Sequence, residues 1–141
     1  MLSPGAQLDA TTRLRHLVER GGEAEVWLGE DIQLGRDVAI KILPAKDPWG
    51  HADATAQEVR AWREARAVAR LLHPSIAAVY HVGIWRERPY LVMEWVEGVS
   101  LRERLAAGPI DPRRASTWLK TIGHAVQHAH GVVVTRARLD T

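Results

Sequence analysis

One lysine stands inside a short apolar stretch, residues 37–43, whose residue types are typical of a buried strand. Side chains alternate between the two faces of a strand, so Lys41 shares a face with Ala39 and Leu43. The opposite face carries Val38, Ile40 and Ile42. An ammonium group in this position either extends along the sheet to reach water, or binds a carboxylate or a phosphate. Lys41 is therefore a candidate for binding an anion.

A glutamate is equally out of place in the helix that the sequence predicts between Asp53 and Leu72. Asp53 is a suitable N-cap, and at about 100° per residue one arc of this helix is apolar. Glu64 falls on the apolar arc, whereas the opposite face carries Arg63, Arg66 and Arg70. Two interpretations stay open: Glu64 reaches solvent from the edge of the arc, or it pairs with a cation under the sheet. Lys41 is the cation that the second interpretation requires.

The elements that must position these two residues follow from the alternation of apolar runs and turn signals. Strands are predicted over residues 13–19, 24–29, 37–43, 77–83 and 89–95, and helices over 53–72, 100–106 and 111–130. Glycines at 21, 22 and 35 mark the first two turns, and Asp111-Pro112 opens the last helix. The expected fold class is α+β: a five-stranded antiparallel sheet with one inserted helix, followed by further helices.

Composition narrows the possible functions. The chain has 141 residues, of which 46% are apolar, and it carries a net charge of +2, too small a bias to indicate a nucleic-acid partner. Without cysteine it has no disulfide and no thiolate metal site, and we expect no metal site at His124 and His128 either. No signal peptide and no membrane-spanning run stand out, so the expected location is cytoplasmic.

Five short motifs stand in order along the chain. They are Val38-Ala39-Ile40-Lys41, Trp62-Arg63-Glu64-Ala65, His73-Pro74-Ser75-Ile76, Val92-Met93-Glu94-Trp95-Val96 and Gly98-Val99-Ser100-Leu101. Through them the chain resembles the N-terminal lobe of a eukaryotic-like protein kinase, most like the bacterial Ser/Thr protein kinases, over about residues 13–130. The resemblance implies a flexible N-terminus (1–12), a kinase N-lobe and hinge (13–97), the start of a C-lobe with two helices (98–131), and a divergent tail (132–141).

The resemblance also implies a function, phosphoryl transfer from ATP to protein serine or threonine, with ATP and a protein substrate as partners. In that family the lysine holds the α- and β-phosphates and pairs with a glutamate, which gives catalytic roles to Lys41 and Glu64. The implied cofactor-binding residues are Val18, Gly21, Gly22, Val26, Ala39, Lys41, Met93, Glu94, Val96 and Ser100.

For most of these residues the resemblance also implies a specific role. Val26 and Ala39 would cover the adenine, Met93 would be the gatekeeper, and the Glu94 carbonyl and Val96 N–H would bind the adenine edge. Ser100 would lie near the ribose. In the Gly-rich loop only the middle glycine, Gly21, is kept. Glu19 and Ala24 replace the other two glycines, and Glu19 is expected to weaken phosphate binding.

The family's later motifs do not follow. Ala129-His130-Gly131 begins the approach to the catalytic loop, but no His-Arg-Asp, catalytic-loop Asn or Asp-Phe-Gly comes after it. Mg²⁺ is implied by the family, yet its protein ligands are missing from this sequence. We expect a chain that left the family's reading frame near His130 and is inactive alone. An inactive kinase-like binding or regulatory module is the alternative function.

The last predicted helix would leave apolar residues uncovered. Leu119, Ile122 and Val126, with residues 132–134, have no obvious element to pack against in this sequence. We therefore expect a partner that covers this helix.

Overall fold

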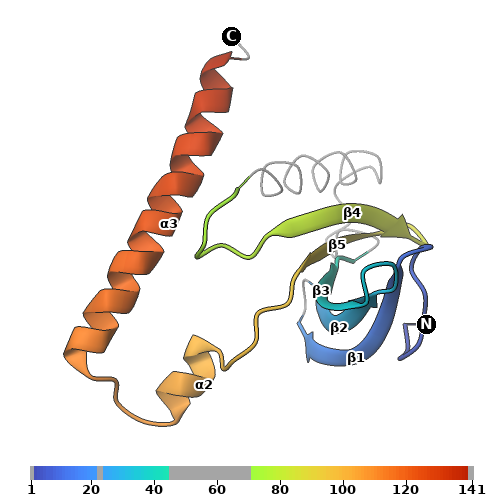
Figure 1. Ribbon diagram of the computed structural model, residues 1–141, viewed down its shortest axis with the longest axis horizontal. Coiled ribbons are helices and arrows are strands. Elements are labelled where there is room, and N and C mark those ends of the chain that lie inside the picture. The colour runs from blue at the N-terminus through green and yellow to red at the C-terminus, as the bar shows by residue number, and fades with distance from the viewer. Residues whose placement is uncertain (1, 22–23, 45–70, 140–141) are drawn as a thin grey trace. The chain divides into compact units, whose positions relative to one another are not determined.

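A five-stranded antiparallel sheet forms the first unit of the chain, as the sequence predicts (Figure 1). The computed structural model describes residues 2–21, 24–44 and 71–139. The part of the predicted inserted helix up to residue 70, with Glu64 in it, lies outside the described residues, and so does Gly22. Within the described residues the strands are β1 (Thr12–Arg20), β2 (Glu25–Asp31), β3 (Arg36–Ile42), β4 (Val79–Trp85) and β5 (Arg88–Glu94). Every strand begins and ends within two residues of its predicted bounds.

The strand order is β1-β2-β3-β5-β4, so β3 lies at the centre and β1 and β4 form the edges. All neighbouring strands are antiparallel. A tight turn at Gly35, whose φ of 61° suits a glycine, joins β2 to β3. Arg86 and Glu87 make the turn from β4 to β5 with positive φ angles of 46° and 64°. The lysine strand is thus hydrogen-bonded on both sides.

One face of the sheet carries the hydrophobic core. In β3 the predicted alternation is confirmed, since Val38, Ile40 and Ile42 are fully buried and Lys41 is exposed. The buried cluster consists of Leu8, Leu14, Trp27, Val38, Ile40, Ile42, Tyr90 and Val92. Burying such a side chain stabilises the fold by about 1.5–3 kcal/mol. The core therefore fixes which face of β3 presents the lysine.

Residues 2–11, here called the N-terminal strap, form contacts with the sheet that the sequence did not indicate. The strap turns back along β1, where the Gly5 N–H donates to the Leu14 carbonyl at 2.8 Å and the Leu14 N–H donates to the Ala6 carbonyl at 2.8 Å. Leu8 is only 8% exposed and belongs to the core cluster. The strap is ordered because it buries this leucine and pairs with an edge strand that would otherwise stay open.

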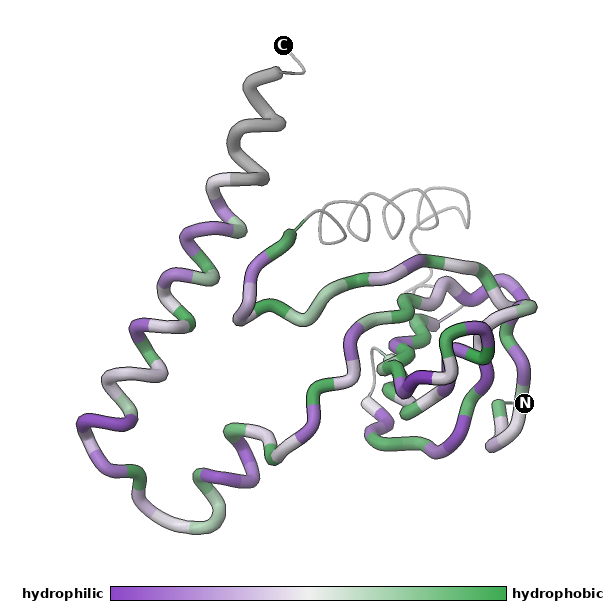
Figure 2. Tube along the Cα trace, viewed as in Figure 1, coloured by the Kyte–Doolittle hydropathy of each residue, from purple (hydrophilic) through white to green (hydrophobic). Residues whose placement is uncertain are grey.

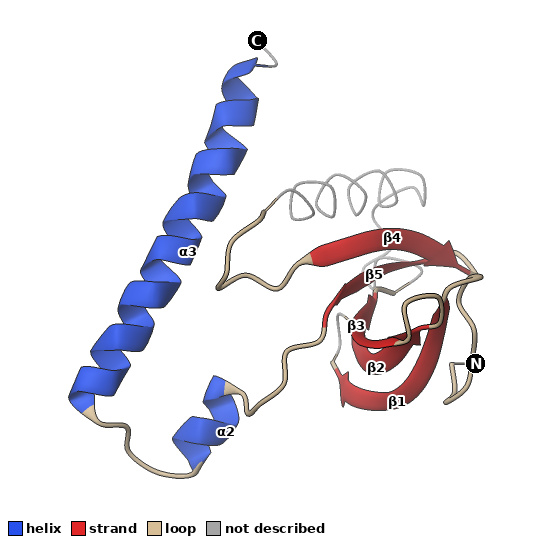
Figure 3. Ribbon diagram, viewed as in Figure 1, coloured by secondary structure: helices blue, strands red, loops and turns tan. Residues whose placement is uncertain are grey.

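Two helices make up most of the second unit, which comprises residues 71–76 and 96–141 (Figure 3). Helix α2 spans Leu101–Ala106, and Ser100, predicted as its first residue, is its N-cap. Helix α3 spans Pro112–Leu139. Asp111 begins α3 by accepting the Arg113 and Arg114 N–H groups at 3.0 and 3.1 Å.

Helix α3 extends beyond its predicted end at about His130. Gly131 lowers helix propensity by about 1 kcal/mol but does not stop the helix, because no proline follows it. Figure 2 shows apolar segments recurring between polar ones along α3. Leu119, Ile122 and Val126 are all exposed on it. Among the described residues no helix combines the length and the apolar character needed to cross a membrane.

The carboxylate of Asp9 holds the strap in place. Burial opposes its ionisation, but hydrogen bonds from Tyr90, Thr11 and His81 outweigh burial and keep the pKa of Asp9 well below its usual value. Burial, then the hydrogen bond and charge of Asp9, raises the pKa of Tyr90 above its usual value. Asp9 is therefore charged, and Tyr90 neutral, at every physiological pH.

This arrangement predicts that the protein loses stability in acid. Because the folded state lowers the pKa of Asp9, its contribution is complete above about pH 4 and is lost as the pH falls below that value. Thermal unfolding between about pH 6 and pH 2.5 should show the difference between wild type and Asp9→Asn shrinking as the pH falls. The control is Asp37→Asn, which removes an exposed carboxylate 2.7 Å from Arg15. A difference that stays constant over this range would contradict the prediction.

Candidate functional site

The face of the sheet opposite the core brings several of the predicted site residues together. In the β-ladder Lys41 lies opposite Val26 on β2 and opposite Leu91 on β5. Ala39, on the same face, lies opposite Met93. Val26, Ala39 and Met93 are half-buried, whereas Lys41 is exposed. The result is an apolar strip with one cation beside it, an arrangement suited to a flat apolar ring that carries an anionic group.

The turn between β1 and β2 ends close to this face. Glu19 lies opposite Val26 in the register, and Val18 is at an irregularity of β1 with its side chain exposed. The Gly21 N–H donates to the Ala24 carbonyl at 2.9 Å. A Cβ on Gly21 would lie 3.6 Å from that carbonyl oxygen, which is an ordinary contact distance. The fold itself therefore tolerates a side chain at Gly21.

A charged pair that sequence reasoning missed braces the strand ends beside Lys41. The Arg88 Nη2 donates to the Glu25 carboxylate at 3.1 Å, and the Arg88 Nε donates to the Leu43 carbonyl at 3.0 Å. Trp27 Nε1 also donates to the Glu25 carboxylate, at 3.2 Å. These bonds tie the start of β2 to the end of β3 and the start of β5. Glu25 and Arg88 are 63 residues apart, so only the tertiary structure brings them together.

At the opposite end of β5, Glu94 uses its side chain and its N–H within the sheet unit. The Glu94 N–H donates to the Ala78 carbonyl at 2.8 Å, and the Ala78 N–H donates to the Glu94 carboxylate at 3.1 Å. The Glu94 N–H is therefore not available for a ligand. The predicted adenine contact of Glu94 falls on its main-chain carbonyl instead.

The remaining predicted site residues, Val96 and Ser100, belong to the second unit. Val96 is exposed. Ser100 accepts the Glu103 N–H at 3.2 Å and its own N–H donates to the Glu103 carboxylate at 2.6 Å, a capping box. The main-chain bond from Ser100, then the side-chain bond, lowers the pKa of Glu103. The Ser100 hydroxyl hydrogen is not used in the cap.

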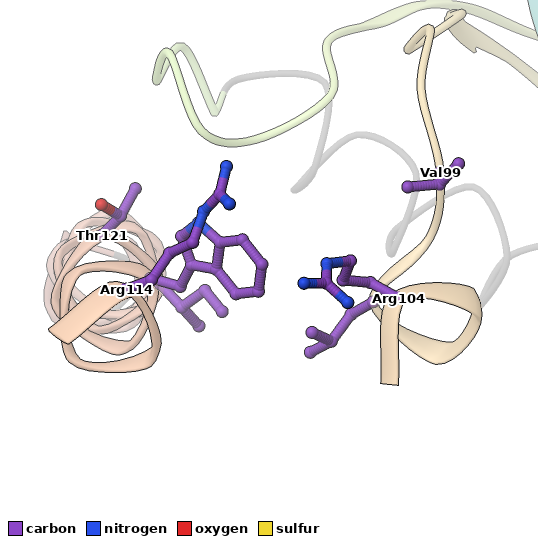
Figure 4. A pocket seen from close by; sticks show the side chains of 7 residues that line it. Val99, Arg104, Arg114 and Thr121 are labelled. Carbon is purple, nitrogen blue, oxygen red and sulfur yellow. The ribbon is translucent and has the colours of Figure 1, made fainter. Parts of the chain in front are cut away.

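A pocket of about 410 Å³ lies between α2 and α3, both in the second unit (Figure 4). Arg104 extends into it from α2, and Arg114 and Thr121 come from α3. The Arg114 guanidinium lies over the Trp118 ring, 5.6 Å from its centroid. The full lining is Val99, Leu101, Arg104, Arg114, Trp118, Thr121 and Ile122. Sequence periodicity gave no sign of this pocket because it depends on how the two helices pack.

Comparison with known proteins agrees with this geometry. The family described as "Protein kinase domain" matches residues 13–135. Serine/threonine-protein kinase PrkC of Bacillus subtilis is 37% identical over 127 residues, covering 89% of this chain and 19% of that protein. Serine/threonine-protein kinase PknB of Mycolicibacterium smegmatis is 41% identical over 126 residues, covering 80% and 19%. The crystal structure of the Mycobacterium tuberculosis PknI kinase domain has a TM-score of 0.75 at 21% identity, covering 93% and 52%.

The sheet, the lysine strand and these matches define a protein kinase fold, and the chain belongs to the protein kinase family. Within that family it is similar to bacterial serine/threonine-protein kinases, which confirms the resemblance seen in the sequence. The chain spans about a fifth of the length of the curated relatives that it matches, and about half of the solved kinase domain.

The brace at Arg88 gives a testable prediction. Arg88→Lys keeps the charge but replaces the spaced Nε and Nη2 donors of the guanidinium with one nitrogen, which cannot reproduce the bonds to both Leu43 and Glu25. We therefore expect a loss of about 1–2 kcal/mol in the free energy of unfolding. The control is Arg13→Lys, an exposed arginine 4.0 Å from Glu30, for which the loss should stay below about 0.5 kcal/mol. Urea unfolding of the two variants measures both values. Equal effects would show that Arg88 does not brace the sheet.

Proposed function

We propose that this chain is the ATP-binding part of a protein serine/threonine kinase. The observation that carries the proposal is Lys41, exposed at the centre of the sheet beside half-buried Val26 and Ala39. The fold makes this lysine point away from the core, on the same face of the sheet as Val26 and Ala39. Membership of the protein kinase family, together with similarity to bacterial Ser/Thr kinases, supports the same role.

The residues of the sheet would bind ATP in two ways. Val26, Ala39 and Met93 supply an apolar surface that removes the adenine from water. The Lys41 ammonium would bind phosphate oxygens, an interaction that strengthens as water is excluded. Its predicted partner Glu64 would hold the ammonium in place. Outside the sheet, the resemblance to the family gives Ser100 a place near the ribose.

Magnesium does not fit the residues of this chain. In protein kinases the aspartate of Asp-Phe-Gly and a catalytic-loop asparagine hold the metal, and a sequence with no phenylalanine contains no Asp-Phe-Gly. Within residues 2–21, 24–44 and 71–139, no group of three or more histidines and acids is placed to hold a metal ion. No part of the proposed ATP binding is therefore assigned to magnesium.

The transfer step itself is not assigned to these 141 residues. It needs the aspartate of the catalytic loop, and the sequence has no His-Arg-Asp. The same observation favours a second candidate, a kinase-like module that binds nucleotide and acts through a partner without transferring phosphate. A phosphotransfer assay separates the two functions.

Binding of ATP should depend on Lys41. With ATP at about 100 times its dissociation constant, the wild type should gain about 2.7 kcal/mol of stability. Lys41→Met should bind at least about tenfold more weakly. Lys120→Met, which removes an exposed lysine from α3, should bind like wild type. Thermal unfolding with and without ATP measures all three, and equal stabilisation of Lys41→Met would refute the proposed site.

Gly21→Ala extends this test, because the fold tolerates a Cβ there. Its melting temperature without ATP should match that of wild type while its response to ATP falls, because a side chain keeps the loop backbone away from phosphate. An unchanged ATP response would remove Gly21 from the site.

In a phosphotransfer assay with a generic protein substrate, we expect no transfer from the purified 141-residue chain. Activity that disappears in Lys41→Met would overturn this expectation and assign catalysis to the chain itself. Activity that persists in Lys41→Met would come from a contaminating kinase.

A further inference from the structure

The carboxylate of Asp9 contacts both edges of the sheet. Its Oδ1 faces the β1 edge, accepting the Thr11 N–H at 2.7 Å, the Thr12 N–H at 2.8 Å and the Thr11 hydroxyl at 2.9 Å. The Thr12 hydroxyl donates to Oδ2 at 3.2 Å. Thr12 is the first residue of β1 and is almost completely buried. The Asp9 carboxylate, mainly through Oδ1, therefore fixes where β1 begins.

The other oxygen faces the opposite edge. Oδ2 accepts the Tyr90 hydroxyl of β5 and lies 3.2 Å from the His81 Nε2 of β4. An ionised carboxylate only accepts hydrogen bonds, so His81 carries a hydrogen on Nε2. Because β1 and β4 are the two edges of the sheet, a single carboxylate joins them.

Gly83 makes room for this contact. A Cβ at position 83 would clash with the hydroxyl end of the Tyr90 ring, which lies over the glycine backbone. The ring is 2% exposed and makes an edge-on contact with His81, with centroids 6.1 Å apart. The Gly83 backbone, the Tyr90 ring and the Asp9 carboxylate therefore pack together and connect the strap with β4 and β5.

We propose that Asp9 is a positioning residue that latches β1 to β5, through Thr12 and Tyr90, and thereby sets the curvature of the nucleotide face of the sheet. The part of this proposal that concerns the nucleotide face rests on the proposed function. Beyond Thr12, β1 leads to the Gly21 turn, and beside Tyr90 on β5 stands Leu91, opposite Lys41. A latch between Thr12 and Tyr90 therefore fixes the β1–β2 hairpin relative to the strands that carry Lys41 and Met93.

The alternative is that Asp9 only stabilises the strap. The strap buries Leu8 and pairs with β1 through its own main chain, so both interactions would survive loss of the Tyr90 hydroxyl. Under this alternative, Tyr90→Phe would leave the nucleotide face and its affinity for ATP unchanged.

The first test is amide hydrogen exchange on the full chain. Tyr90→Phe removes one hydroxyl and keeps the buried ring, so it is the variant best able to fold. We expect the Gly5, Leu8 and Leu14 amides, none of them bonded to Asp9, to exchange about tenfold faster in Tyr90→Phe. The matched control is Tyr80→Phe, which removes a hydroxyl from an exposed tyrosine on β4. Equal exchange in both variants would overturn the latch.

The second test is the dissociation constant of ATP, measured by titration calorimetry on the same proteins. Tyr90→Phe and Asp9→Asn should bind ATP about threefold or more weakly than wild type, whereas Tyr80→Phe should not differ. Faster exchange with unchanged ATP affinity would limit Asp9 to holding the strap and overturn its positioning role. If the wild type binds no ATP, the proposed function fails, and the exchange comparison still decides whether Asp9 latches the sheet.

Discussion

The alternation of side chains along β3 is the constraint on which the rest of the structure depends. Burial of Val38, Ile40 and Ile42 fixes the orientation of the central strand, and a slip of one residue in the register would put all three into water. The same alternation leaves Lys41 on the opposite face, beside Val26 on the neighbouring strand. The energy that folds the sheet therefore also places the cation, without any interaction made by the cation itself.

Much of the fold could be predicted because its signals are local. Periodicity and turn residues located the five strands, and the pattern of β3 gave the correct face for Lys41. Five motifs in order, Val38-Ala39-Ile40-Lys41 among them, then gave the family. The predicted end of α3 was wrong because the helix continues past Gly131 to Leu139, and a single glycine lowers helix propensity without ending a helix.

The candidate site could be predicted only in part, because its supporting contacts join residues far apart in sequence. The partners Glu25 and Arg88 are 63 residues apart, and Asp9 and Tyr90 are 81 residues apart. Neither pair follows a periodic pattern. The contacts of the N-terminal strap could not be predicted for the same reason: its composition is that of a loop, and Leu8 and Asp9 contact strands that lie elsewhere in the chain.

The N-terminal strap shows that the start of a family match and the start of the folded domain need not coincide. The match to the protein kinase family starts at residue 13, whereas the strap contacts β1 from Gly5 onward. A recombinant protein trimmed to the shared region would lose Leu8 and Asp9, and Tyr90 would keep a buried hydroxyl without its acceptor. It would also uncover the outer edge of β1, and an open strand edge is a template for pairing with another molecule. Boundaries drawn from similarity alone would thus turn a well-folded lobe into a self-associating one.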